Sequence, residues 1–335
     1  MLFCCRAVLG VEFPPVCAIC GENRFQICHL DHKLRSYQIQ TAKVLLIKAA
    51  LHFSALLPLR WAHAIATPIA SIVWALSSDS RRITRCNLAL CFPQLTERER
   101  EKLARASALE TTKFACELGR VWLRSVDEVL ASIVSVSGQE VLEIALARGK
   151  GVIVLAPHIG NWELCGLYLD RRAQTTYLYK PPKLVGFEDA IVSYRGRAGA
   201  RLAPTSRKGI AMLVKALERG EIVGILPDQE PALDSGVFAP FFGVPALTMT
   251  LVAKLAARTQ AAVIVMYAER LPQGKGFAIR ITEADVGVAA EDLETAGAEL
   301  NRQVERCVRE VPVQYQWEYR RFKHQPDNSK NALYR

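Results

Sequence analysis

The chain has 335 residues, of which half are hydrophobic and 23% are charged. This composition excludes a disordered chain, and the length allows one large α/β domain with appendages. The formal net charge of +10 favours an anionic partner such as nucleic acid, anionic lipid or a phosphorylated substrate.

Cysteines crowd the start of the chain. Five of the ten lie within the first thirty residues: Cys4, Cys5, Cys17, Cys20 and Cys28. With His29 and His32 they offer zinc ligands, but no second Cys-x-x-Cys pair completes a site. We therefore expect residues 1–40 to be an atypical, poorly ordered extension without a metal. The other cysteines are scattered singly, which is typical of reduced, mostly buried thiols.

Residues 41–78 form a candidate membrane-anchoring segment. No uninterrupted apolar run reaches the ~18 residues of a spanning helix, because charged side chains and histidines interrupt it. Trp61 and Trp74 suit a membrane interface. We expect two short helices that lie in or dip into one leaflet, with a single tilted span as the close alternative. A buried helical hairpin of a soluble core fits the same pattern.

A basic cluster and a helix start follow this segment. Arg81, Arg82 and Arg85 are placed to meet lipid head groups if the preceding segment binds a membrane. Thr96-x-x-Glu99 matches a capping box, which predicts a helix that runs to about Leu118.

The body of the chain alternates between β-rich apolar runs and amphipathic segments. The predicted strands are Ile133–Val136, Val152–Leu155, Thr176–Tyr179, Ile222–Leu226, Ala262–Tyr267 and Phe277–Ile281. The predicted helices are Gln139–Ala147, Trp162–Leu169, Lys208–Arg219, Thr248–Arg258 and Glu291–Arg309. This alternation predicts an α/β fold with a largely parallel mixed sheet flanked by helices. Ligands of such sheets bind beyond the carboxyl ends of the strands.

A histidine and a carboxylate lie at one such end. His158 follows the strand Val152–Leu155, and Asn161 is a good N-cap for the next helix. Glu163 then falls in the first helical turn, where we expect the His158 ring to fold back onto its carboxylate. A histidine held by a carboxylate is the arrangement that removes a proton from a hydroxyl. Asp228, with Gln229 beside it, follows another predicted strand and lies at the same edge.

Residues 171–208 hold nine basic residues against two acidic ones. A solvated basic face is one interpretation. The other is a cradle for phosphates, with Arg195 and Arg197 at its centre.

Two aromatic segments complete the candidates. Core packing is the default for aromatics, but a loop bounded by Gly and Pro favours an apolar channel lined by Phe238, Phe241, Phe242 and Gly243. The run 315–323 mixes aromatics with cations and suits an anionic membrane surface. RNA binding is its rival, without an accompanying RNA-binding signature.

Six segments together resemble the bacterial lipid A biosynthesis acyltransferases, the lauroyl/myristoyl transferase family with a glycerolipid acyltransferase-like fold. They are Asn87–Pro93, Pro157–Glu163, Arg195–Arg197, Pro227–Gln229, Val237–Gly243 and Gln314–Lys323. The resemblance covers roughly residues 42–326, so we expect the acyltransferase domain over 79–326 and a basic tail over 327–335. The chain departs from the family pattern at Glu230-Pro231, where many members have Asp and an aromatic residue, and at Tyr319, where many have His.

The resemblance implies transfer of a fatty acyl chain from an acyl carrier protein thioester to a hydroxyl of a lipid A precursor, a phosphorylated glycolipid. It implies His158 as general base with Glu163 orienting it, no metal or cofactor, and no covalent acyl-enzyme. It also implies the cytoplasmic face of the inner membrane. Cys165 reads as a buried helical thiol rather than a nucleophile.

Three alternatives stay open. The same chemistry could serve a lysophospholipid, an amino-acid lipid or a glycosylated phosphoinositide. A non-catalytic, membrane-tethered binding protein would have no use for the His158 motif. A hydrolase would share the histidine, but the chain lacks a Gly-x-Ser-x-Gly elbow.

Overall fold

A computed structural model describes residues 40–182, 184, 186–327 and 329–334. The expected extension of residues 1–40, with its candidate zinc ligands, lies outside the described residues apart from Gln40. Among the described residues, no three His, Cys, Asp or Glu side chains are grouped so that they could hold a metal ion.

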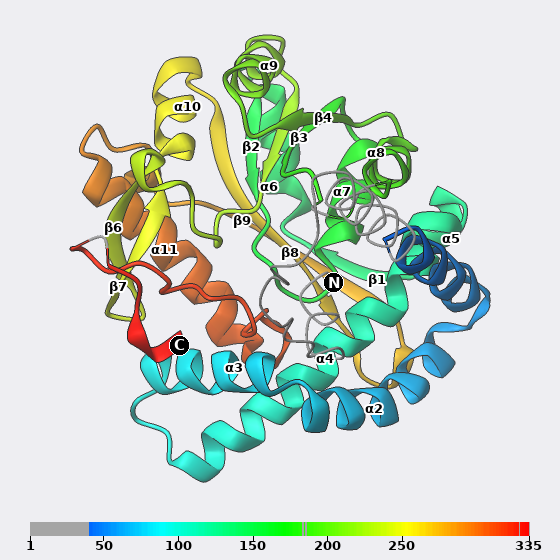
Figure 1. The fold of residues 1–335 in the computed structure, drawn as a ribbon. Coiled ribbons are helices and arrows are strands. Elements are labelled where there is room, and N and C mark those ends of the chain that lie inside the picture. The colour runs from blue at the N-terminus through cyan, green and yellow to red at the C-terminus, as the bar shows by residue number, and fades with distance from the viewer. Residues whose placement is uncertain (1–39, 183, 185, 328, 335) are drawn as a thin grey trace, which may run out of the picture.

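A seven-stranded sheet forms the centre of the fold (Figure 1). Its strands, in spatial order, are β1 (Ile133–Ser137), β9 (Phe277–Glu283), β8 (Ala262–Arg270), β2 (Val152–Leu155), β5 (Ile222–Ile225), β3 (Thr175–Tyr179) and β4 (Arg201–Pro204). Neighbouring strands are parallel except β8 and β9. The predicted α/β fold with a largely parallel mixed sheet is confirmed, and all six predicted strands are present. The short β4 escaped prediction because Arg and Pro bound its apolar residues.

Helices cover both faces of the sheet (Figure 1). One face packs against α3 (Ser78–Cys91), α9 (Arg207–Glu218), α10 (Leu251–Thr259) and α11 (Leu293–Glu310). The other packs against α4 (Glu97–Leu123), α5 (Val126–Leu130), α6 (Gln139–Ala147) and α7 (Trp162–Asp170). Because Ile153 and Leu155 join one core and Val152 and Val154 the other, the β2 run is apolar throughout. The capping box at Thr96 is confirmed.

The remaining elements are short. They are α8 (Glu188–Gly196), the hairpin β6 (Gly236–Phe241) and β7 (Val244–Met249), and 3-10 turns at Leu233–Ser235, Pro272–Gly274, Val286–Ala289, Pro312–Gln314 and Ala332–Tyr334.

The candidate membrane segment folds as two helices, over residues 40–56 and as α2 (Leu59–Leu76). One side is packed: α2 buries Ala62, Ala66, Ala70 and Trp74. The other side exposes a set of large apolar side chains: Leu45, Leu46, Phe53, Leu56, Trp61, Ile69, Ile72 and Leu76. By length and composition, α2 is the one described helix that could cross a membrane, a test that core helices also pass.

The two aromatic segments differ from what we expected. Residues 236–249 form a hairpin rather than a loop, with positive φ at Phe242 (51°) and Gly243 (77°) in its two-residue turn. Phe241 is buried in the core. The run 315–323 is also core, because Trp317 is buried and Arg321 donates to the Leu247 carbonyl. The prediction that this run forms a membrane surface is therefore wrong.

Candidate active site

His158 lies in the turn that joins β2 to α7. The Asn161 side chain accepts a hydrogen bond from the Leu164 N–H at 3.2 Å, so the predicted N-cap is confirmed. Gly160 has φ of 59°, and a Cβ there would lie 1.9 Å from the Ala268 carbonyl oxygen. Only glycine fits this approach to β8. The Gln316 N–H donates to the His158 carbonyl at 3.1 Å, so the turn is held from two sides.

Asp228 orients His158. Leu155 of β2 pairs with Ile225 of β5, and His158 and Asp228 each lie three residues beyond that pair. The His158 Nδ1–H donates to Asp228 Oδ1 at 2.8 Å, and the His158 backbone N–H donates to Oδ2 at 3.0 Å. Burial alone raises the pKa of Asp228, but the charge of His158 and its hydrogen bonds outweigh burial and hold that pKa below its ordinary value.

Glu163 is not the orienting carboxylate, and that prediction is wrong. Its carboxylate accepts hydrogen bonds from Arg195 Nε at 3.0 Å and from Trp122 Nε1 at 3.0 Å, whereas the ring Nδ1 of His158 bonds Asp228. Burial raises the pKa of Glu163, but the charge and hydrogen bonds of Arg195 outweigh it, so the pKa lies below its ordinary value. Glu163 remains a buried anion whose charge Arg195 neutralises.

The two expected phosphate ligands serve the fold in this structure. Arg195 donates hydrogen bonds to the Glu163 carboxylate through its Nε and one terminal nitrogen. Arg197 Nη2 donates to the Val121 carbonyl at 2.6 Å, near the C-terminal end of α4. Together they tie α8 and the residue after it to α7 and α4, rather than forming the centre of an open cradle.

The far nitrogen of His158 faces Gln229. The Gln229 amide Nε2 lies 3.2 Å from His158 Nε2, which fits an amide N–H donating to an unprotonated imidazole nitrogen. Trp162 meets the ring edge-on, with centroids 4.9 Å apart. In the described part of the chain, no ring contact or hydrogen bond joins Phe238, Phe242 or Gly243 to His158.

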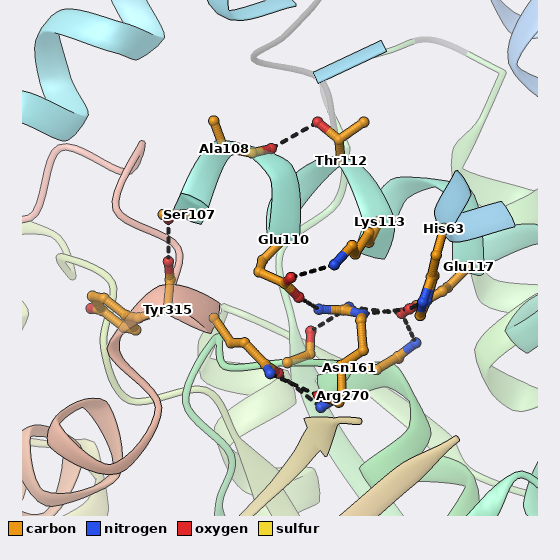
Figure 2. A network of polar contacts seen from close by, with 12 residues as sticks. His63, Ser107, Ala108, Glu110, Thr112, Lys113, Glu117, Asn161, Arg270 and Tyr315 are labelled. Carbon is orange, nitrogen blue, oxygen red and sulfur yellow. Dashed lines mark hydrogen bonds and ion pairs between the residues drawn. The ribbon is translucent and has the colours of Figure 1, made fainter. Parts of the chain in front are cut away.

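A buried ionic network lies behind the turn (Figure 2). Its centre is Glu117 of α4, which is 1% exposed. Glu117 accepts hydrogen bonds from Asn161 Nδ2 at 2.9 Å, Arg270 Nη2 at 2.7 Å and His63 Nε2 at 2.6 Å. Arg270 also donates to Glu110 at 2.9 Å. The network joins α2, α4, the end of β8 and the turn that carries His158, and sequence reasoning missed it.

A second imidazole–carboxylate pair lies two residues beyond Asp228. The His324 Nδ1–H donates to Glu230 Oε2 at 3.0 Å, and the His324 backbone N–H donates to Oε1 at 3.1 Å. The Glu230 N–H in turn donates to the Tyr319 hydroxyl at 2.9 Å. The loop that carries Asp228 is therefore tied to the C-terminal segment, a contact that only tertiary structure reveals.

Cys165 is the thiol nearest the site in sequence. It is 1% exposed, and burial raises its pKa to about 12. A thiol in this state is not a nucleophile, as the sequence predicted.

Known proteins resemble the chain over most of its length. A profile of bacterial lipid A biosynthesis acyltransferases matches residues 28–324. Lipid A biosynthesis lauroyltransferase of Escherichia coli K12 is 28% identical over 250 residues, which cover 73% of this chain and 80% of that protein. Lipid A biosynthesis palmitoleoyltransferase of the same organism is 30% identical over 245 residues, 73% of this chain and 79% of that protein.

A further relative shares only part of the chain. Phosphatidylinositol mannoside acyltransferase of Mycobacterium tuberculosis H37Rv is 29% identical over 166 residues, 47% of this chain and 52% of that protein. Since the profile matches far more than half of the sequence, this acyltransferase belongs to the bacterial lipid A biosynthesis acyltransferase family.

Proposed function

We propose that the chain moves a fatty acyl group from an acyl carrier protein thioester to a hydroxyl of a phosphorylated lipid A precursor, with His158 as general base. The observation that carries this proposal is the geometry of His158. Asp228 accepts from Nδ1 and leaves Nε2 as the basic nitrogen. A lipid A-like acceptor is what the family supports.

The reaction follows from that geometry. An acceptor hydroxyl that displaces the Gln229 amide from Nε2 gives its proton to His158 while its oxygen attacks the thioester carbonyl carbon. Collapse of the tetrahedral intermediate breaks the C–S bond, and the imidazolium returns the proton to the departing thiolate. Asp228 stabilises the imidazolium between these steps, as a buried carboxylate on Nδ1 does in other acyl transfer sites.

This route needs no acyl-enzyme, and burial and a raised pKa argue against Cys165 as a competing nucleophile. We place the reaction at the cytoplasmic face of the inner membrane. The exposed apolar side of residues 40–76 supports membrane association, and the chain's charge of +10 suits anionic lipid and an acidic carrier protein.

The test uses purified full-length protein, acyl carrier protein thioesters of defined chain length and a Kdo-modified lipid A precursor, with products read by mass. We expect one added acyl chain with the wild type and none above background with His158→Ala. A phosphatidylinositol mannoside offered in parallel tests the acceptor named for the mycobacterial relative. Acylation of that glycolipid alone would move the proposal to another acceptor. No transfer to any acceptor would favour the non-catalytic alternative.

A further inference from the structure

A hollow of about 570 Å³ opens between α2, α3 and α4. Its charged lining consists of Arg81, Arg85 and Arg105, with Trp74 beneath them and Ser71 on its rim. We call it the arginine hollow. Among the described residues, the single carboxylate bonded to these arginines is Glu101, at 2.8 Å from Arg85 Nε and 2.9 Å from Arg105 Nε. Glu97 also acts on Arg85 through its charge, so three guanidiniums face two carboxylates and the hollow stays cationic.

The arginines keep free donors. Arg81 Nη1 donates hydrogen bonds to the carbonyls of Trp74 and Ala75 at the end of α2. Arg85 donates to Glu101 through Nε and Nη2, and Arg105 donates to the same carboxylate through Nε. The other guanidinium N–H groups of the three have no partner in the part of the chain that the structure describes. Planar groups with unused donors suit the oxygens of a phosphate.

Trp74 holds two of the guanidiniums in place. The guanidinium carbons of Arg85 and Arg105 both lie 5.6 Å from the centre of its ring, and Trp74 itself is buried. Cation–π contact and the shared Glu101 thus fix both side chains before a ligand arrives. A preformed site loses less side-chain entropy on binding.

The position of the hollow indicates the kind of ligand. On α2, Trp61, Ile69, Ile72 and Leu76 form an exposed apolar strip beside the rim, with the spacing of one helix side. A soluble anion would not require that strip, whereas a lipid brings both an anionic head and an apolar body. At the opposite end of α2, a hollow of about 400 Å³ is also cationic, with Arg120, Arg124 and Lys275 against Glu128.

We propose that the arginine hollow binds the phosphate of a membrane lipid headgroup while the apolar strip of α2 enters the acyl layer. The inference rests on the membrane location proposed above but not on acyl transfer. It assigns α2 to the interface, with its flank at the depth of the headgroups.

The test is co-sedimentation of the full chain with three kinds of phosphatidylcholine vesicle: plain, containing phosphatidic acid, and containing the same charge as cholesteryl hemisuccinate. The variant is Arg85→Gln/Arg105→Gln. The matched control is Arg201→Gln/Arg219→Gln, because these two arginines also share one carboxylate, Glu221, and are similarly exposed. Both variants remove two cations.

We expect the hollow variant to bind phosphatidic acid vesicles about 25-fold more weakly, since each cation near an anionic surface contributes about fivefold. The control should change by less than about twofold, because its site lies away from α2. An Arg85→Lys/Arg105→Lys protein keeps the charge and loses the planar forks, so it should weaken binding to phosphatidic acid but not to hemisuccinate vesicles.

Four results would overturn the inference. Equal losses in the hollow and control variants would reduce it to general charge attraction. Equal losses of the Arg85→Lys/Arg105→Lys protein on phosphatidic acid and on hemisuccinate vesicles would remove phosphate recognition. Displacement by millimolar inorganic phosphate would make the ligand a soluble anion. Failure of the wild type to bind any vesicle would remove the membrane location itself. Acyl transfer to detergent-dispersed acceptor should persist in the hollow variant, which verifies its folding and separates this test from that of the reaction.

Discussion

The loop after β5 holds two histidines in the same way. In each pair a backbone N–H and an Nδ1–H donate to the two oxygens of one carboxylate, His158 to Asp228 and His324 to Glu230. The side chains are similarly buried, 12% exposed for His158 and 15% for His324. The bonds to the carboxylate and the burial therefore do not separate the two imidazoles.

The surroundings of the two imidazoles distinguish them. His158 lies beyond the carboxyl end of β2, with Gln229 on its second nitrogen and Trp162 against its ring. His324 pairs with Lys330 in a short bridge of the C-terminal segment. Position at the end of a parallel strand, where ligands of such sheets bind, is therefore what favours His158 over His324 as the base that we propose. His324 instead fixes the loop on which Asp228 and Gln229 are carried.

Removal of one imidazole or the other should give the largest difference in kcat between the two pairs. His158→Ala should lower kcat by roughly 10²–10⁴-fold, the contribution of a positioned general base. His324→Ala should lower it by less than about tenfold, because it loosens a support and leaves the base in place. Steady-state kinetics with a thioester donor measures both. If the two variants lose activity equally, the distinction between the pairs is wrong.

Substitution of the two carboxylates should also affect kcat unequally, with the larger loss at Asp228. Asp228→Asn should lower kcat by about 10²-fold or more with little change in KM, because an amide neither fixes the tautomer of His158 nor stabilises the imidazolium. Glu230→Gln keeps an acceptor for His324 and should cost much less. A rise in KM alone for the Asp228 variant would return this residue to the substrate-binding role expected from the sequence.

Glu163→Gln tests the carboxylate that the sequence favoured as partner of His158. The amide still accepts a hydrogen bond from Trp122, but the buried side of the Arg195 ion pair loses its charge. We expect a stability loss of about 1–3 kcal/mol, measured by urea unfolding, and a rate loss below that of Asp228→Asn. A rate as low as that of Asp228→Asn, with stability unchanged, would restore Glu163 as the orienting group.

Acid should weaken the His158 pair through Asp228. The folded-state pKa values of Asp228 and Glu163 are both lowered, so their contribution to stability is present above their ordinary values, about 4. That contribution is lost as the pH falls through the lower folded values, and each tenfold difference in proton affinity between the unfolded and folded states is worth about 1.4 kcal/mol. Thermal unfolding between pH 6 and pH 3 should show this decline. The Asp228→Asn variant should show a shallower one, and an unchanged slope would contradict the assignment.

The sequence predicted what depends on local pattern. The helix Gln139–Ala147 has its predicted bounds, and the cap at Asn161 and the position of His158 follow from a strand, a turn and a capping residue. The sequence predicted only part of the pairing between His158 and Asp228. Both Asp228 and His158 were expected at one edge of the sheet, but that β2 and β5 are neighbours is a property of strand order, which periodicity does not contain.

The remaining errors share a cause, because each depends on tertiary contacts between separate segments of the chain. Glu163 and Arg195 were both singled out, yet their pairing depends on how α8 lies against α7. Glu117 and Arg270 lie 153 positions apart in the chain, and neither carries a local signal of burial. Trp317 and Arg321 looked like an interfacial run because sequence alone does not show which cations are covered.

The carboxylate of Glu117 has a consequence for engineered chimeras. It bonds both His63, on the helix proposed to sit in the membrane, and Asn161, in the turn that carries His158. Replacing α2 with a generic transmembrane helix would keep the protein on the bilayer but remove one of the hydrogen-bond partners of a buried carboxylate. A chimera that is to keep the geometry of this turn therefore has to retain His63 together with the buried side of α2, which consists of Ala62, Ala66, Ala70 and Trp74.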